Sequence, residues 1–328
     1  MRTLIIHHND HDGITAAGVA TAYSHSLNCK IDIDYISADY IQPLRDLINN
    51  SGADRYNVIL LLDYSISTDD NARFICEKYE TVPIVWVDHH KSSIDTIKKY
   101  PELGKLPGLR VIGISGVLLT WLFYYNRLPV QYQNLLQSLN NLDTPINKDD
   151  LDKLIDELKP PKTLVAVHKY DIWDHRDPDT ELFHLGYNIT DPNEFVSILL
   201  GTGTDYAVYE GSVQDGKVIK KYVDNQNKEY RDKCGFKTTI YDKSNDRVYN
   251  VFALNTDRTT SLTFGEKMDE YDICMPFYYN GEKDAWSYSL YTNKDDVDCS
   301  YIAKALGGGG HKQAAGFSMK TCKTKFDI

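Results

Sequence analysis

Three short stretches of the sequence combine carboxylate and imidazole side chains in a pattern that could bind metal ions. They are "HHNDHDG" (7–13), "LLDYS" (61–65) and "VDHH" (87–90), and each includes or follows the end of an apolar run. Such side chains are costly to desolvate unless they are coordinated or hydrogen-bonded. Carboxylates mixed with a few imidazoles suit Mn²⁺, Mg²⁺ or Fe²⁺ better than a cysteine-based zinc site. The candidate residues are Asp10, Asp12, Asp63, Asp88, His89 and one of His7 and His8.

The apolar runs that precede these residues are typical of strands in a parallel sheet. "RTLIIHH" (2–8), "YNVILLLDYS" (56–65) and "TVPIVWVDHH" (81–90) alternate with helical patterns at 14–27 and 67–80. This order predicts a parallel sheet with helices on both faces. The carboxyl ends of parallel strands lie along one edge, where ligands bind. We therefore expect the three stretches to meet in one cleft.

Enough carboxylates are present for two metal ions. Two ions about 3.5–4 Å apart can bind a phosphoryl group and generate hydroxide between them. Asp63, in the middle stretch, is the candidate for the shared ligand. A single Asp after a strand is usually a turn former or a helix cap. Three consecutive strand ends with Asp, two of them with adjacent His, favour a metal centre instead.

The sequence predicts two domains joined by a polar segment. Helical patterns continue the first domain, at 114–128, 129–142 and 161–175. Three strand patterns and one helical pattern follow in the second, at 247–255, 272–280, 285–292 and 299–306. We place the domains at 1–204 and 236–328, with a connecting helix or linker at 205–235.

A glycine run, "GGGGHKQAAGF" (307–317), follows the last predicted helix. It is not a Walker loop, because no Ser or Thr follows Lys312 and the run ends a helix. Consecutive glycines permit positive φ and let backbone N–H groups approach a ligand closely. His311 and Lys312 would add positive charge there. A flexible turn remains the alternative interpretation.

Composition limits the class of protein. The 328 residues carry a formal net charge of −11, which argues against binding long nucleic acid by charge alone. Small anionic substrates fit, because divalent cations reverse the local field. The six cysteines form no CxxC pair, the amino terminus has no signal-peptide core, and no apolar run approaches the ~20 residues of a membrane span. We expect a cytoplasmic protein with reduced thiols and no membrane partner.

Together these motifs resemble the DHH phosphoesterase superfamily. "DHH" at 88–90, with "HNDHDG" before it and "LLDYS" between, resembles the DHH domain, and "GGGGHKQAAGF" resembles the DHHA1 domain that follows it in the family. The resemblance covers nearly the whole chain. It implies an α/β protein with a parallel-sheet DHH domain flanked by helices, a smaller α/β DHHA1 domain, and an active site in the cleft between the domains.

The resemblance also implies roles for individual residues. Asp63 would bridge the metals, Asp88 would orient the cluster, and His90 would face the phosphate, so that these three are the catalytic set. The implied metal ligands are His8, Asp10, Asp12, Asp63, His89 and Asp171, with His7 and Asp174 as alternatives to His8 and Asp171. The implied substrate-binding residues are His90, Arg258, Gly308, Gly309, Gly310, His311 and Lys312. The stretch 114–119 resembles a motif that serves close packing and placement.

The predicted activity is that of a metal-dependent phosphodiesterase of the nanoRNase or RecJ-like type. It would cleave short oligonucleotides from one end to mononucleotides, through a hydroxide activated by two metals, with Mn²⁺ preferred and Mg²⁺ or Fe²⁺ open. Hydrolysis of cyclic dinucleotides or of adenosine 3′,5′-bisphosphate is the alternative. A nucleic-acid-binding module is the non-enzymatic alternative, since DHHA1-like domains also hold tRNA beside alanyl-tRNA synthetase domains. The sequence allows a homodimer.

Overall fold

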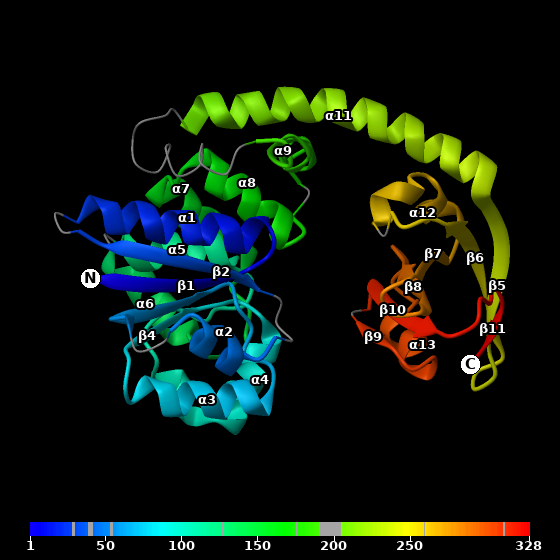
Figure 1. Ribbon diagram of the computed structural model, residues 1–328. Helices are drawn as coiled ribbons and strands as arrows, with labels where there is room; N and C mark the ends of the chain where they lie inside the picture. Colours follow the sequence, from blue (N-terminus) through cyan, green and yellow to red (C-terminus); the bar gives the residue numbers. More distant parts are fainter. Residues whose placement is uncertain are drawn as a thin grey trace. The chain divides into compact units, whose positions relative to one another are not determined.

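The computed structural model describes residues 1–27, 30–38, 42–52, 55–125, 128–174, 176–190, 205–258, 260–310 and 312–328. They form two compact units, Met1–Ile219 and Lys220–Ile328, each with its own sheet (Figure 1). Within those ranges, no helix is both long enough and apolar enough to cross a bilayer.

The sheet of the first unit has four parallel strands in the order β2-β1-β3-β4. Their bounds are β1 Arg2–His8, β2 Asp32–Ala38, β3 Val58–Leu62 and β4 Ile84–Val87. The predicted parallel sheet is thus confirmed, with three of its strands in the predicted segments. The edge strand β2 was not predicted. Its sequence, "DIDYISA", alternates polar and apolar residues and suits an edge that is only partly covered.

Helices cover both faces of this sheet (Figure 1). Successive side chains of a strand point to opposite faces, so Ile5 of β1 enters one apolar core while Leu4 and Ile6 enter another. Helices on the Ile5 side are α1 His11–Ser26, α5 Gly116–Tyr124, α6 Val130–Leu139, α7 Lys148–Leu158, α8 Lys162–Asp171 and α9 Asp179–Tyr187. Helices on the other side are α2 Leu44–Asn50, α3 Asp69–Tyr79 and α4 Lys91–Lys99.

The predicted connecting segment at 205–235 is one helix, α11 (Asp205–Cys234), of 30 residues. Asp205 accepts hydrogen bonds from the backbone N–H groups of Lys162 (2.6 Å) and Thr163 (3.0 Å), and so caps the amino terminus of α8. The two units divide within α11, between residues 219 and 220. The predicted domain bounds of 1–204, 205–235 and 236–328 stay a prediction.

The second unit is built on a mixed sheet of seven strands in the order β11-β5-β6-β7-β8-β10-β9. The bounds are β5 Gly235–Asp242, β6 Arg247–Asn255, β7 Ile273–Asn280, β8 Ala285–Tyr291, β9 Gly309–Gly310, β10 Ala314–Met319 and β11 Phe326–Asp327. The three predicted strands correspond to β6, β7 and β8, and the predicted helix to α13 (Cys299–Ala305). Short segments η3 (Ser261–Phe264) and α12 (Lys267–Glu270) complete the unit. The α/β class is confirmed for both units.

Candidate metal centre

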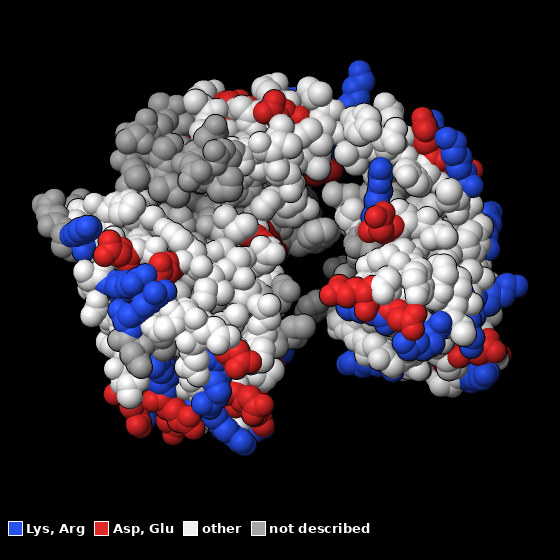
Figure 2. Space-filling model, viewed as in Figure 1, with Lys and Arg blue, Asp and Glu red and all other residues white. Residues whose placement is uncertain are grey.

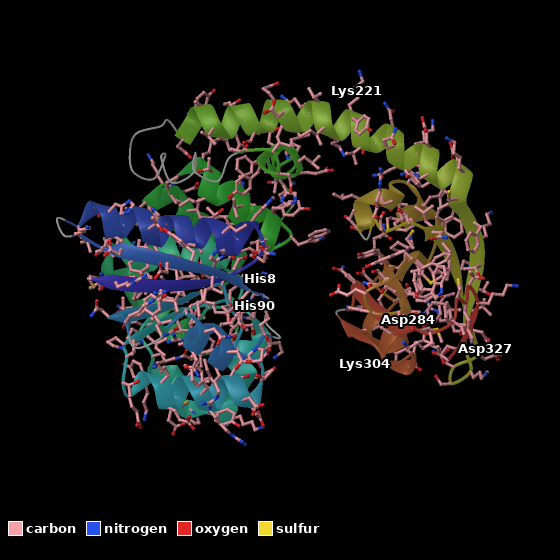
Figure 3. All side chains as sticks on the ribbon, in the orientation of Figure 1. His8, His90, Lys221, Asp284, Lys304 and Asp327 are labelled. Carbon is pink, nitrogen blue, oxygen red and sulfur yellow. The ribbon has the colours of Figure 1, made fainter. Side chains whose placement is uncertain are left out.

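The carboxyl ends of β1, β3 and β4 bring the three predicted stretches together. His8 ends β1, Asp63 follows β3, and Asp88 follows β4. Figure 3 labels His8 and His90 at this edge of the sheet, where Nδ1 of each lies 3.9 Å from a carboxylate oxygen of Asp63. Three groups of side chains there could each hold a metal ion, with ligand atoms within 4.8 Å of one another. The groups are His8, Asp10 and Asp63; Asp63, His89 and His90; and Asp12, His89 and Asp171.

Asp63 and His89 link these groups. The Nε2 atom of His89 lies 3.3 Å from Oδ1 of Asp63, 3.5 Å from Oδ2 of Asp171 and 3.8 Å from Oδ2 of Asp12. The other oxygen of Asp63, Oδ2, lies 3.9 Å from Nδ1 of His8. That nitrogen lies 2.8 Å from Oδ2 of Asp10. The two oxygens of Asp63 therefore face different sets of ligands.

Buried polar atoms of this cluster fit a metal centre. Both carboxylate oxygens of Asp63, Nε2 of His89 and Oδ2 of Asp171 are buried and accept or donate no hydrogen bond among the described residues. Buried polar atoms nearly always have a partner, so each exception needs an explanation. Oxygen and imidazole donors that converge without hydrogen bonds are suited to a divalent cation such as Mn²⁺ or Mg²⁺.

The pKa shifts of these side chains also favour a metal centre. Burial, reinforced by the charge of Asp171, raises the pKa of Asp12 to about 7. Burial and the charges of Asp12 and Asp10 raise the pKa of Asp63, and burial raises that of Asp171. Burial alone would lower the pKa of His89, but the charges of Asp171 and Asp12 outweigh it and raise the pKa. A cation among these carboxylates would relieve their repulsion and keep them ionised.

Asp63 has an unusual backbone conformation, with φ of 51°. The left-handed region is costly for a residue with a side chain and is found mainly at Gly, Asn and Asp. Here the backbone N–H of Asp63 donates to the carbonyl oxygen of Val87 on β4 at 2.8 Å, which holds the turn in place. Strain of this kind is concentrated at functional sites.

Comparisons with known proteins show which sequences and folds resemble this chain. The sequence matches no known family description. An uncharacterised protein of Acanthamoeba polyphaga mimivirus is 23% identical over 256 residues, which are 72% of this chain and 48% of the relative. The chain thus spans about half the length of the curated relative that it matches.

Solved structures resemble the chain over nearly its whole length. The DHH domain of a member of the s1p family of ribosomal proteins is 13% identical, with a TM-score of 0.55 over 97% of this chain and 82% of that one. The fold of the chain is therefore similar to that of a DHH domain. RecJ from Thermus thermophilus, solved with Mn²⁺, is 11% identical with a TM-score of 0.49 and covers 100% of this chain and 53% of that one. A pGpG-specific phosphodiesterase from Vibrio cholerae is 13% identical with a TM-score of 0.44, over 97% and 93% of the two chains.

In the structure, the two alternatives left open by the sequence, His7 or His8 and Asp171 or Asp174, lie at different places. His7 is buried and its Nδ1 lies 2.8 Å from the backbone oxygen of His8, so His8 is the histidine of this pair in the cluster. Asp171 lies in the cluster, whereas Asp174 accepts hydrogen bonds from Nε (2.7 Å) and Nη2 (2.6 Å) of Arg176. These bonds lower the pKa of Asp174 to about 2.

Within the triplet Asp88-His89-His90, Asp88 contacts and positions His90. Oδ1 of Asp88 lies 2.7 Å from Nδ1 of His90, and the hydroxyl of Ser93 donates to Oδ2. Burial would lower the pKa of His90, but the charge and hydrogen bond of Asp88, together with the charge of Asp63, outweigh burial and raise it. Asp88 is fully buried and pairs through its backbone with Arg110. The positioning role that the resemblance implies for Asp88 is consistent with these contacts.

Two further contacts support the cluster, and one of them, made by His168, was missed at the level of sequence. Oδ1 and Oδ2 of Asp12 accept hydrogen bonds from the backbone N–H groups of Val117 (2.9 Å) and Gly116 (2.5 Å), at the start of α5. The preceding N–H, that of Ser115, donates to Nδ1 of His168 at 3.2 Å. The stretch 114–119 thus serves placement, as its resemblance implied. His168 gave no signal, because a lone His on a helix is usually a core residue.

The predicted substrate-binding residues of the second unit are only partly described. His311 lies outside the described residues. Gly309 and Gly310 form β9 and pair with Gly316 and Ala315 of β10. Lys312 is exposed, and Nη1 of Arg258 donates to Oδ1 of Asn227 at 2.9 Å. Their role in binding substrate stays a prediction, as does an active site in the cleft between the domains.

Proposed function

We propose that the protein is a divalent-metal-dependent phosphodiesterase that hydrolyses short oligonucleotides from one end to mononucleotides. The observation that carries this proposal is the position of Asp63, whose two oxygens face His89 on one side and His8 on the other. A carboxylate so placed can bridge two ions, the arrangement that stabilises both the attacking and the leaving oxygen in phosphoryl transfer.

The ligands divide into two sets in this proposal. His8 and Asp10 would hold one ion, together with Asp63, and the other would be held by Asp12, Asp63, His89 and Asp171. When bound, two Mn²⁺ ions would lower the pKa of a water and neutralise charge on the phosphoryl group. Mg²⁺ and Fe²⁺ suit the same donor set.

His90 would act on the phosphate directly. Its raised pKa favours the imidazolium form, which can donate a hydrogen bond to a phosphoryl oxygen. Asp88 accepts from Nδ1 of His90 and so fixes the orientation of the ring. Hydrogen bonds from preorganised donors of this kind become stronger as negative charge develops in the transition state.

Charge favours small substrates. The net charge of −11 would repel a long polyanion. On the face drawn in Figure 2, acidic and basic side chains lie intermixed in small groups. In the second unit we propose that Arg258, Gly308, Gly309, Gly310, His311 and Lys312 bind the phosphate or terminal nucleotide of a short substrate.

A substrate panel with Mn²⁺ tests the proposal. The panel contains 5′-labelled di- to pentanucleotide RNA, single-stranded DNA of 30 nucleotides, a cyclic dinucleotide and adenosine 3′,5′-bisphosphate. We expect mononucleotides from the short RNA at the highest rate. A higher rate on the cyclic dinucleotide or the bisphosphate would identify that compound as the preferred substrate and leave the proposed mechanism unchanged. Binding without turnover of any substrate would favour the nucleic-acid-binding module.

Asp63→Asn is the variant that tests the mechanism. Asn tolerates the left-handed backbone of position 63 nearly as well as Asp, so the fold should be kept while the ligand is weakened. We expect activity to fall at least 100-fold. Full Mn²⁺-dependent activity in this variant would overturn the mechanism. Asp70→Asn, in the first turn of α3, is the matched control and should be as active as the parent.

A further inference from the structure

A ring-lined pocket of about 200 Å³ adjoins the metal cluster within the first unit. Asp10, Asp12 and Asp171 lie on its wall, together with aromatic residues of α8, α9 and the turn between them. The volume is below the ~300–1,000 Å³ of pockets that take drug-sized ligands, yet holds several waters of ~30 Å³ each. Its size therefore suits one planar ring system.

The pocket wall is built from rings that hold one another. The rings of Tyr170 and His184 stack with centroids 3.4 Å apart and planes at 7°. His11 packs against His184 and Tyr187, with centroids 4.6 and 4.4 Å apart, and its Nδ1 lies 3.2 Å from Nδ1 of His184. The predicted cluster does not use His11. Mutual packing fixes these rings before any ligand arrives, which lowers the entropic cost of binding.

Trp173 adds an accessible face to this wall. Its side chain lines the pocket yet is 55% exposed, and its backbone lies in the left-handed region with φ of 59°. Few bulky residues adopt that conformation. The turn is held by neighbours: the N–H of Trp173 donates to the carbonyl of Tyr170 (3.1 Å), and that of Asp174 to the carbonyl of Lys169 (2.7 Å). The fold thus holds the indole beside the metal cluster, although this requires a strained backbone conformation and leaves an apolar ring exposed to water.

We propose that this pocket binds one nucleobase of the substrate, stacked on Trp173, while the adjoining phosphate lies at the metal cluster. The inference rests on the proposed function and names a specificity site for it. Base–aromatic stacking tolerates any base, because every base has a π-face.

Binding of adenosine 5′-monophosphate and of ribose 5-phosphate tests the inference without turnover. The full-length protein is titrated with each by calorimetry, as the parent, Trp173→Ala, Trp173→Phe and Tyr79→Ala. We expect the parent to bind the nucleotide at least tenfold more tightly than the sugar phosphate. Trp173→Ala should lose this preference, Trp173→Phe should keep most of it, and the control Tyr79→Ala, on α3, should match the parent. An unchanged preference in Trp173→Ala overturns the inference.

Hydrolysis separates the inference from the proposed function. Each enzyme is assayed on a dinucleotide and on analogues that lack one base, at either position. If the parent hydrolyses the dinucleotide, Trp173→Ala should lose about tenfold in kcat/KM on it and change little on the analogue without the stacked base. Equal losses on all substrates would overturn the base site while the phosphodiesterase stands. No hydrolysis by the parent would refute the proposed function, and the nucleotide titration would still decide whether the pocket binds a base.

Discussion

The backbone N–H of Gly116 donates a hydrogen bond of 2.5 Å to Oδ2 of Asp12, which lies 104 residues earlier in the chain. The amino terminus of α5 thereby faces a buried carboxylate and stabilises its charge. The contact is so close that a Cβ on Gly116 would lie 2.5 Å from Cβ of Asp63 and 2.8 Å from Oδ2 of Asp12. A glycine is therefore required for the two carboxylates and the helix to meet.

Gly116→Ala should displace both carboxylates. We expect a loss of stability of about 1–3 kcal/mol from overpacking and a much larger effect on metal binding, because both Asp12 and Asp63 must move. Urea unfolding and Mn²⁺ titration measure the two effects. Gly211→Ala is the matched control: among the described residues, no atom beyond its own helix backbone and chain neighbours lies within 4 Å of the added Cβ, and the substitution should stabilise α11 by roughly 0.5–1 kcal/mol. Unchanged Mn²⁺ affinity in Gly116→Ala would contradict this account.

How far the sequence predicts this site depends on which interactions are local. Strand ends that carry Asp and His were visible in the sequence, since the parallel sheet collects them at one edge. The choice of His8 over His7 needed the structure, because side chains of neighbouring strand residues point to opposite faces and a sequence does not say which is buried. The link from His168 to Ser115 joins residues 53 positions apart, and no local pattern indicates it.

The same distinction applies to the fold. The strand β3 was predicted from its long apolar run, because a strand buried on both faces needs one, although the predicted run of 56–65 extends beyond Val58–Leu62 at both ends. The edge strand β2 was missed because half of its residues are polar. In the second unit, β5 and β10 were missed although both pair with predicted strands. The position of β10 is set by pairing with β8, which lies well before it in the chain, whereas β5 forms a local hairpin with β6 that the sequence analysis did not recognise.

Asp171 and Asp174 can be told apart by metal binding. Asp171→Asn removes a carboxylate that lies 3.5 Å from His89, so Mn²⁺ affinity should fall at least tenfold. Asp174→Asn loses an ion pair with Arg176 and should lower stability by about 1 kcal/mol or less while Mn²⁺ affinity is kept. Calorimetric titration of Mn²⁺ measures the affinities. The reverse ranking would assign the ligand to Asp174.

His168 should make the protein sensitive to acid. Burial lowers its pKa from 6.5 to about 3, so the native state keeps the ring neutral while the unfolded state binds a proton below pH 6.5. Stability contributed by His168 is therefore present above pH 6.5 and is lost as the pH falls towards 3. In His168→Asn, the amide oxygen can still accept the hydrogen bond from Ser115. Between pH 8 and pH 5, the parent should lose about 2 kcal/mol of unfolding free energy that this variant keeps.

Urea unfolding at the two pH values measures this difference. His25→Asn, at an exposed histidine of α1, is the matched control and should follow the parent. The buried carboxylate of Asp12 acts in the opposite direction: its pKa of about 7 lies above the ordinary 3.8, so its contribution to stability falls as the pH rises between these values. Because parent and variant share Asp12, this effect cancels in the comparison. A constant difference between pH 8 and pH 5 would show that His168 titrates normally in the native state.

Neighbouring glycines of the run at 307–310 should respond differently to the same substitution. A Cβ on Gly308 would lie 2.6 Å from Cβ of Phe317 in β10, so Gly308→Ala should cost about 1–3 kcal/mol of stability. In the part of the chain that the structure describes, no atom apart from those of its chain neighbours lies within 4 Å of a Cβ on Gly309, so Gly309→Ala should fold as stably as the parent. Position 309 therefore separates substrate binding from packing. If the run contacts a phosphate through its backbone, Gly309→Ala should raise KM several-fold with an unchanged thermal melt, whereas a packing turn predicts an unchanged KM.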